Sequence, residues 1–229
     1  MKIFWSWQSD TPGNTGRHFV RAALLDAITV LKQPEEIEEP TQAENRESMH
    51  LDQDRQGVTG SPGLADTIKK KIEVSMVFIA DITPVSKIAK RKDVKGSREK
   101  RNMNPNVAIE LGYALHALDE SGVLLVLNEY YGGREFIPFD LQHLGGPIMY
   151  NLPPGASKEQ TAAERANLRG QFVTALRAYL KDAPAGEPQS AFRRIPSTTS
   201  RVVWFQPGAV LAELDAQTQY GFAAKKAYT

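Results

Sequence analysis

Two nearly continuous apolar runs of strand length constrain the fold of this chain more than any other feature. They are residues 75–81 (SMVFIAD) and 122–128 (GVLLVLN). A strand that is apolar on both faces is typical of the centre of a parallel sheet, where helices cover each face. Three shorter segments also have the composition of strands, at residues 2–8, 48–52 and 147–151.

Segments with helical spacing of apolar residues separate these strands. We predict helices at residues 18–32, 64–73, 104–118 and 159–180. Strands that alternate with helices indicate an α/β fold, with a five-stranded, mostly parallel sheet and helices on both faces. We expect the acidic segment 35–47 to be a solvated loop, and the basic segment 84–103 to be a long mobile loop.

The pattern changes after residue 181. Residues 182–200 are rich in Pro, Ala and Ser, which is typical of a linker. The segments that follow are too small to build a core. We therefore predict a domain over residues 1–181, a linker over 182–200, and a region over 201–229 that is either a C-terminal tail packed on the domain or the start of a truncated second, sensor domain.

Composition excludes several kinds of chemistry. The chain has 229 residues, no cysteine and a formal net charge of +1. Disulfides and thiolate sites are therefore excluded, and the charge offers no field that attracts nucleic acid or a membrane. The four histidines are scattered without ligand spacing, so we expect no metal site. No apolar run approaches the roughly 18 residues of a membrane span, and no signal peptide is evident, so we expect a cytoplasmic protein.

One carboxylate, Glu110, lies in the first turns of the predicted helix at residues 104–118. Asn104 is suited to cap this helix and Pro105 to occupy its first position. Apolar residues recur at helical spacing and should form its buried stripe: Val107, Leu111, Ala114, Leu115 and Leu118. Because Glu110 lies beside that stripe, partial burial of its charge costs free energy unless the carboxylate has a bonding partner or a functional role.

Asn106, Glu110 and Tyr113 form one polar stripe of this helix, at spacings of four and three. In a parallel sheet, ligands bind at the carboxyl ends of the strands, where the loops at 8–10, 52–55 and 81–83 meet the start of this helix. A carboxylate there could accept hydrogen bonds from ribose hydroxyls, or stabilise an oxocarbenium-like sugar as a leaving group departs. The alternative is a partly exposed Glu110 paired with a cation of the basic segment.

The order of the elements and four local strings resemble a bacterial TIR domain, within the wider group that includes nucleoside deoxyribosyltransferases. The strings are IFWSWQSD at 3–10, LDQDRQGVTGSPGLADTI at 51–68, VFIADIT at 77–83 and NPNVAIELGYA at 104–114. They resemble the first strand with its loop, the second strand with the BB loop and next helix, the third strand, and the helix of the catalytic glutamate. The resemblance covers residues 1–180 and implies the flavodoxin-like TIR fold.

This resemblance implies an enzyme that cleaves the bond between nicotinamide and ribose in NAD+. Its products are nicotinamide and ADP-ribose or a cyclic ADP-ribose, NAD+ is the substrate, and no cofactor is required. The catalytic glutamate corresponds to Glu110. Nicotinamide in NAD+ is already a cationic leaving group, so no general acid is needed. The usual Trp-Cys pair before the glutamate is replaced by Asn104-Pro105-Asn106, which is closer to the deoxyribosyltransferase-like branch.

The resemblance also implies regulation by assembly. TIR enzymes are typically activated by self-association, in which the BB loop, here from Arg55 to Gly63, completes a neighbour's site. It suggests a bacterial anti-phage defence effector, switched on through a sensor domain or a partner protein. The basic segment has no aromatic residue for base stacking, so we do not expect direct nucleic-acid binding. It could instead contact another subunit or attract anionic NAD+.

Five further residues have a functional and a structural interpretation each. Ser9 could contact phosphate or ribose, or cap a turn. Trp5 and Trp7 share a strand face, and one of them, for which we choose Trp7, could stack on a base or nicotinamide ring or be a core aromatic. Asp81 could orient ribose or the Glu110 helix, or cap a turn.

Arg55 could hold a pyrophosphate or contact a neighbouring subunit. Tyr113 could line the pocket or pack against other side chains.

Two alternatives to the NAD+ hydrolase remain for the whole chain. One is a non-catalytic TIR scaffold that serves assembly, and the other is an enzyme that transfers deoxyribose between nucleobases.

Overall fold

The computed structural model describes residues 1–33, 40–53, 63–89, 99–142 and 144–182. Five strands in these ranges form one sheet: β1 (Lys2–Ser6), β2 (His50–Asp52), β3 (Val77–Asp81), β6 (Val123–Asn128) and β7 (Ile148–Tyr150). Their order is β2-β1-β3-β6-β7, and every neighbouring pair is parallel. When the five strands of this sheet are numbered 1 to 5 along the chain, their order is 2-1-3-4-5, which is the order of flavodoxin-like α/β folds. The predicted fold class is therefore confirmed.

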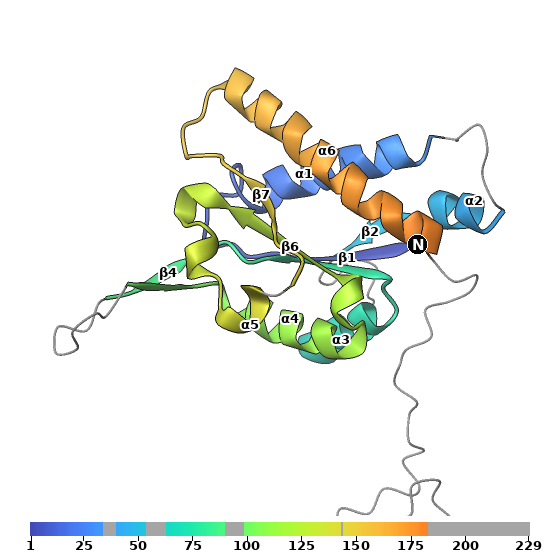
Figure 1. Ribbon diagram of the computed structural model, residues 1–229, viewed down its shortest axis with the longest axis horizontal. Helices are drawn as coiled ribbons and strands as arrows, with labels where there is room; N and C mark the ends of the chain where they lie inside the picture. The colour runs from blue at the N-terminus through green and yellow to red at the C-terminus, as the bar shows by residue number, and fades with distance from the viewer. Residues whose placement is uncertain (34–39, 54–62, 90–98, 143, 183–229) are drawn as a thin grey trace, which may run out of the picture. The chain divides into compact units, whose positions relative to one another are not determined.

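Helices cover both faces of this sheet, as Figure 1 shows. One face carries α1 (Arg17–Leu31) and α6 (Lys158–Asp182), and the other carries α3 (Leu64–Glu73) and α4 (Pro105–Ala117). A 3-10 turn at Glu120–Gly122 precedes β6, and two more, at Glu129–Tyr131 and Arg134–Phe136, lie between β6 and the short helix α5 (Phe139–Gln142). None of the described helices is long and apolar enough to cross a membrane.

The alternation of side chains along the central strands builds two separate cores. Ile3 and Trp5 pack with α1 and α6, whereas Phe4 between them packs with α3 and α4. Every residue of β3 is buried, as the continuous apolar run predicts for a strand covered on both faces. On the α3–α4 side, the rings of Phe4 and Phe78 stack with their centres 5.8 Å apart.

The acidic segment contains a helix where we predicted a loop. Helix α2 spans Pro40–Glu47, after residues that lie outside the described ranges. Its sequence, PTQAENRE, begins with proline and continues largely with residues that favour helix. Its last turns also contact the residue that precedes β1, because the amino group of Met1 donates to the carbonyl oxygen of Asn45 at 3.2 Å. Charge indicates that a segment is solvated, but it does not prevent helix formation.

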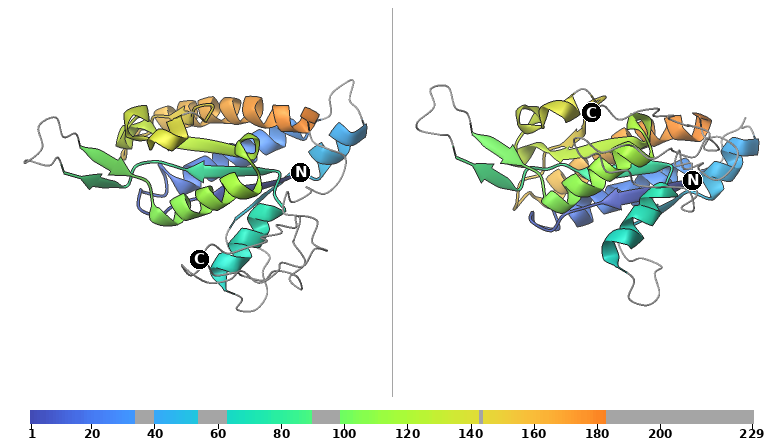
Figure 2. Two further views of the ribbon diagram at one scale, coloured as in Figure 1. Left: turned by 60° about the horizontal axis from the view of Figure 1, so that its bottom comes forward. Right: turned by 90° about the horizontal axis from the view of Figure 1, so that it is seen from below.

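The basic segment is also not simply a loop. Strands β4 (Ser86–Ile88) and β5 (Lys100–Asn102) pair in an antiparallel ribbon, with Lys87 opposite Arg101; Figure 2 shows the ribbon from two further sides. Arg101 anchors it, because its guanidinium lies 4.2 Å from the ring centre of Phe136 and donates to the carbonyl oxygen of Tyr131. Backbone pairing does not depend on side-chain charge, so the charge pattern could not reveal it.

The chain divides by its internal contacts into two units, Met1–Ala191 and Phe192–Thr229. The sheet, its helices and both cores belong to the first unit. The predicted tail at 201–229 and the predicted linker after residue 182 lie outside the described residues.

Candidate functional site

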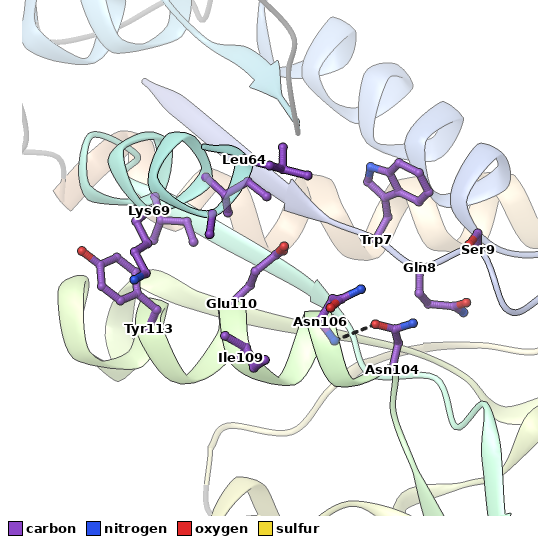
Figure 3. A pocket seen from close by; sticks show the side chains of 13 residues that line it. Trp7, Gln8, Ser9, Leu64, Lys69, Asn104, Asn106, Ile109, Glu110 and Tyr113 are labelled. Carbon is purple, nitrogen blue, oxygen red and sulfur yellow. Dashed lines mark hydrogen bonds between the residues drawn. The ribbon is translucent and has the colours of Figure 1, made fainter. Parts of the chain in front are cut away.

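A cavity of about 480 Å³ opens where the carboxyl end of β1 meets α3 and α4 (Figure 3). Strand β1 is the point at which the strand order reverses, since β2 lies on one side of it and β3 on the other. Ligands of open α/β sheets bind at such a reversal, outside the carboxyl ends of the strands. The lining side chains come from three segments of the chain: residues 7–9, residues 64–72 and residues 104–113.

Glu110 lies in the wall of this cavity, half-buried on α4. The helix is held on the sheet by Val107, Leu111 and Ala114, which are buried as predicted, and by Ala117, while Leu115 and Leu118 of the predicted stripe are only half-buried. The Ser6 hydroxyl, at the last position of β1, donates to Glu110 Oε2 at 2.5 Å. The carboxylate is therefore attached to the central sheet as well as to its own helix.

The first turn of α4 has the cap that the sequence predicts. Asn104 Oδ1 accepts hydrogen bonds from the backbone N–H groups of Asn106 at 2.8 Å and Val107 at 3.4 Å, and Pro105 occupies the first position. The Asn104 amide also donates to Asp10 Oδ2 at 2.7 Å. This contact joins the start of α4 to the loop after β1, two of the segments that contribute side chains to the cavity.

Gln8 shapes the loop after β1 from beneath. Its side chain is buried, and its Oε1 accepts from the backbone N–H groups of Asp10 at 2.5 Å and Thr11 at 3.1 Å. Its Nε2 donates to Thr11 Oγ1 at 2.8 Å and to Asp81 Oδ2 at 3.3 Å. Ser9 is thereby held at the cavity, where its side chain is exposed.

Asp81 lies beneath this loop and is not among the residues that line the cavity. It is completely buried, and its Oδ1 accepts from the backbone N–H of Thr83 at 3.0 Å. Burial raises the pKa of Asp81 to about 6, although the hydrogen bonds from Thr83 and Gln8 act in the opposite direction. The Asp81 carboxyl group accepts hydrogen bonds from Gln8 and Thr83 and does not line the cavity. Of the predicted roles of Asp81, the turn cap is the one that the structure shows.

Two aromatic side chains border the cavity on opposite walls. Trp7 is half-buried, with the Arg17 guanidinium carbon 4.8 Å from its ring centre, whereas Trp5 is a core residue. On α4, the Tyr113 hydroxyl donates to Glu73 Oε1. Burial, followed by the contact with Glu73, raises the pKa of Tyr113 to about 12, so the phenol is neutral at physiological pH.

One cation of the described chain lines the cavity. Lys69 on α3 lies with its Nζ 5.7 Å from the ring centre of Tyr113, and it is exposed. The predicted pyrophosphate ligand Arg55 and most of the loop from Arg55 to Gly63 lie outside the described residues. The described ranges hold no group of three or more histidine or carboxylate side chains that could bind a metal ion.

The structure thus brings together five of the seven predicted site residues: Trp7, Ser9, Asn106, Glu110 and Tyr113. It adds Ser6, Gln8 and Lys69, which we did not single out from the sequence. One signal could have identified Ser6. It is a polar residue directly after the apolar residues 3–5, two positions after Phe4 and hence on the same face of the strand as Phe4.

Comparisons with known proteins identify no family. No protein-family model matches the chain, and no curated protein matches it. Among solved structures, a flavodoxin-like domain from a Synechococcus sp. protein matches with a TM-score of 0.39 and 8% sequence identity, over 78% of this chain and 99% of that chain.

Proposed function

We propose that this cavity cleaves the N-glycosidic bond of NAD+ between nicotinamide and ribose. When this bond breaks, its electron pair moves to the ring nitrogen of nicotinamide. Nicotinamide then leaves as a neutral molecule. A water molecule then adds to the ribose carbon and loses a proton, which yields ADP-ribose. When an internal nucleophile of the substrate replaces water, the product is a cyclic ADP-ribose.

The observation that carries this proposal is the half-buried carboxylate of Glu110 in the wall of a cavity at the carboxyl end of β1. The reaction develops positive charge on the ribose ring as nicotinamide leaves. A carboxylate that is already oriented stabilises this charge without reorganisation during the reaction. No acid is required at the leaving group, which agrees with a cavity in which Glu110 is the single carboxylate among the described lining residues.

The other lining residues suit the remaining parts of the substrate. Trp7 offers an aromatic face for the nicotinamide or adenine ring, and Ser9 and Asn106 offer groups that bond ribose hydroxyls. Lys69 offers a positive charge to the pyrophosphate. The cavity volume, about 480 Å³, is within the usual range for small-molecule sites.

We further propose that the enzyme is regulated by self-association through the loop from Arg55 to Gly63, and that it acts as an anti-phage effector with a sensor domain or partner. The support is the resemblance of the four sequence strings to bacterial TIR domains. An enzyme that depletes NAD+ harms its own cell, so a mechanism that keeps it inactive is expected.

Nicotinamide release from NAD+ by the full chain tests the proposal, measured before and after assembly is induced by crowding agents or by lysate from phage-infected cells. We expect Glu110→Gln to abolish release, since the amide keeps the shape of the side chain but carries no charge. Glu120→Gln is the matched control, because Glu120 is exposed just after α4. Full activity of Glu110→Gln would contradict the role of Glu110.

The deoxyribosyltransferase alternative keeps one specific observation in its favour, the sequence Asn104-Pro105-Asn106 before the glutamate. Assays with deoxynucleosides and a free base, run beside the NAD+ assay, separate the two enzymes. Assembly without turnover of either substrate would favour the non-catalytic scaffold.

A further inference from the structure

Ser6 occupies an unusual place for a hydroxyl group. It is the last residue of β1, it is 1% exposed, and it pairs with Ala80 of the central strand β3. Its neighbours on the same face of the sheet are apolar, since Phe4, Phe78 and Ala80 belong to the core beneath α3 and α4. A buried hydroxyl is costly unless it has a hydrogen-bond partner.

The partner of Ser6 is the carboxylate of Glu110, at 2.5 Å from Oγ to Oε2. The two residues are 104 positions apart in the chain, so the contact exists only because α4 packs across the end of β1. A hydrogen bond to an ionised carboxylate is short and about twice as strong as one between neutral groups. The hydroxyl itself does not line the cavity.

We propose that Ser6 is a positioning residue for the Glu110 carboxylate, an inference that rests on the proposed function of the cavity. A glutamate side chain has several rotatable bonds, and on a helix surface it samples several rotamers. A donor on the rigid central sheet selects one of them. The carboxylate is then oriented before the substrate binds.

Burial excludes the other chemical role for a serine beside a carboxylate. A serine activated by a glutamate base would be a nucleophile, and a nucleophile must reach the substrate. With 1% of its surface exposed, Ser6 cannot reach it. Its effect on the reaction is therefore exerted through the orientation of Glu110 alone.

This role predicts a specific kinetic signature. The orientation of Glu110 matters most when charge develops on the ribose, and much less when NAD+ binds. We expect Ser6→Ala to lower kcat about tenfold or more, the loss expected for one hydrogen bond to a charged group. The KM for NAD+ should stay within about twofold. Ser6→Thr keeps a hydroxyl at this position and should restore most of kcat.

The matched control is Ser75→Ala. Ser75 is likewise a buried serine, and its hydroxyl donates a hydrogen bond to the carbonyl oxygen of Lys71 at 2.6 Å. It lies just before β3, however, at the amino ends of the parallel strands and not at the carboxyl ends, where the cavity lies. It measures what the loss of a buried hydroxyl costs by itself, and we expect kcat within about twofold of the wild type. An equal fall of kcat in both alanine variants would overturn the inference.

A second measurement does not depend on activity. In the full chain with 13C-labelled glutamate, the carboxyl resonance of Glu110 is identified by its disappearance in Glu110→Gln. We expect Ser6→Ala to shift this resonance and Ser75→Ala to leave it in place.

If the wild type releases no nicotinamide under any condition, the proposed function fails, and the resonance alone decides whether Ser6 holds the carboxylate. A resonance that Ser6→Ala leaves unmoved would overturn the inference, whatever the activity.

Discussion

At the scale of single residues, the cavity is defined by two opposite charges on two helices, Glu110 on α4 and Lys69 on α3. These are the charged side chains among the described residues that line it. The rest of the lining consists of uncharged polar and apolar groups, such as Asn106, Ile68 and Tyr113. One charge suits the developing cation of a ribose ring, and the other suits a phosphate.

Lys69 should therefore affect binding of a substrate that carries phosphate. We expect Lys69→Met to raise the KM for NAD+ about fivefold with kcat nearly unchanged, as for the loss of one exposed charge pair. The KM for nicotinamide riboside, which has no phosphate, should not change. Lys70→Met is the control, because Lys70 is exposed on the same helix but does not line the cavity. Equal losses with both substrates would contradict a contact with phosphate.

Asp81 should make stability depend on pH. Its pKa is raised from 3.8 to about 6 in the folded chain, so between these values the folded state holds a proton that the unfolded state has released. The stabilisation by protonated Asp81 is complete below pH 3.8 and is lost as the pH rises through about 6.

Asp81→Asn removes this titration and leaves the other carboxyl groups in place. The free energy of unfolding of the wild type relative to Asp81→Asn should fall by about 3 kcal/mol as the pH rises through that window. Urea unfolding of both proteins from pH 4 to 7.5 measures the difference. A difference that is independent of pH would show that the carboxyl group titrates normally.

At the scale of elements, α4 connects the site to the fold. Its buried side, with Val107, Leu111 and Ala114, packs on the sheet, and its first turn is tied through Asn104 to Asp10 in the loop after β1. Helix propensity and capping could be predicted from the sequence because each depends on residues within a few positions. The contact with Asp10 could not, since it joins residues 94 positions apart.

The cap of α4 can be tested separately from that contact. We expect Asn104→Ala to lower the free energy of unfolding by about 1 kcal/mol, because two backbone N–H groups lose their acceptor. Asn104→Ser supplies an oxygen for the cap without the amide that reaches Asp10, so it should recover most of the stability. Urea unfolding at neutral pH measures both. A serine variant as unstable as the alanine variant would assign the stabilisation to the Asp10 contact.

At the scale of the whole molecule, the two faces of the sheet differ in their position relative to the cavity. The core beneath α1 and α6 contains residues such as Phe172 and Leu24, while the core beneath α3 and α4 lies next to the cavity. Because strand residues alternate between the faces, each face can be changed with limited effect on the other. Stability should therefore depend on both faces, and catalysis mainly on one.

A pair of core substitutions tests this separation. Phe172→Ala on α6 and Leu111→Ala on α4 each empty a buried site, and we expect losses of about 3–5 and about 2–5 kcal/mol in the free energy of unfolding. At a temperature where both variants remain folded, only Leu111→Ala should lower kcat, because Leu111 supports the turn that carries Glu110. Equal loss of kcat in both variants would show that the faces are coupled.

Local patterns along the chain were enough to predict the elements whose structure depends on neighbouring residues. Apolar runs identified the central strands, and helical spacing identified α1, α3, α4 and α6. The cap of α4 was predicted as well, and it lies with Glu110 at the cavity. The same local patterns gave wrong predictions at α2 and at the β4–β5 ribbon. Both segments are rich in charged residues and were predicted as loops, but they form a helix and a pair of strands.

The contacts between residues far apart in the chain depend on how the elements pack together. This packing brings Ser6 against Glu110, buries Asp81 in contact with Gln8, and brings Lys69 to the cavity that Glu110 also lines. These contacts depend on the order of strands in the sheet and on how α3 and α4 pack against it. Neither is encoded in the spacing of residues along the chain, because the hydrophobic pattern specifies which face is buried but not which partner covers it.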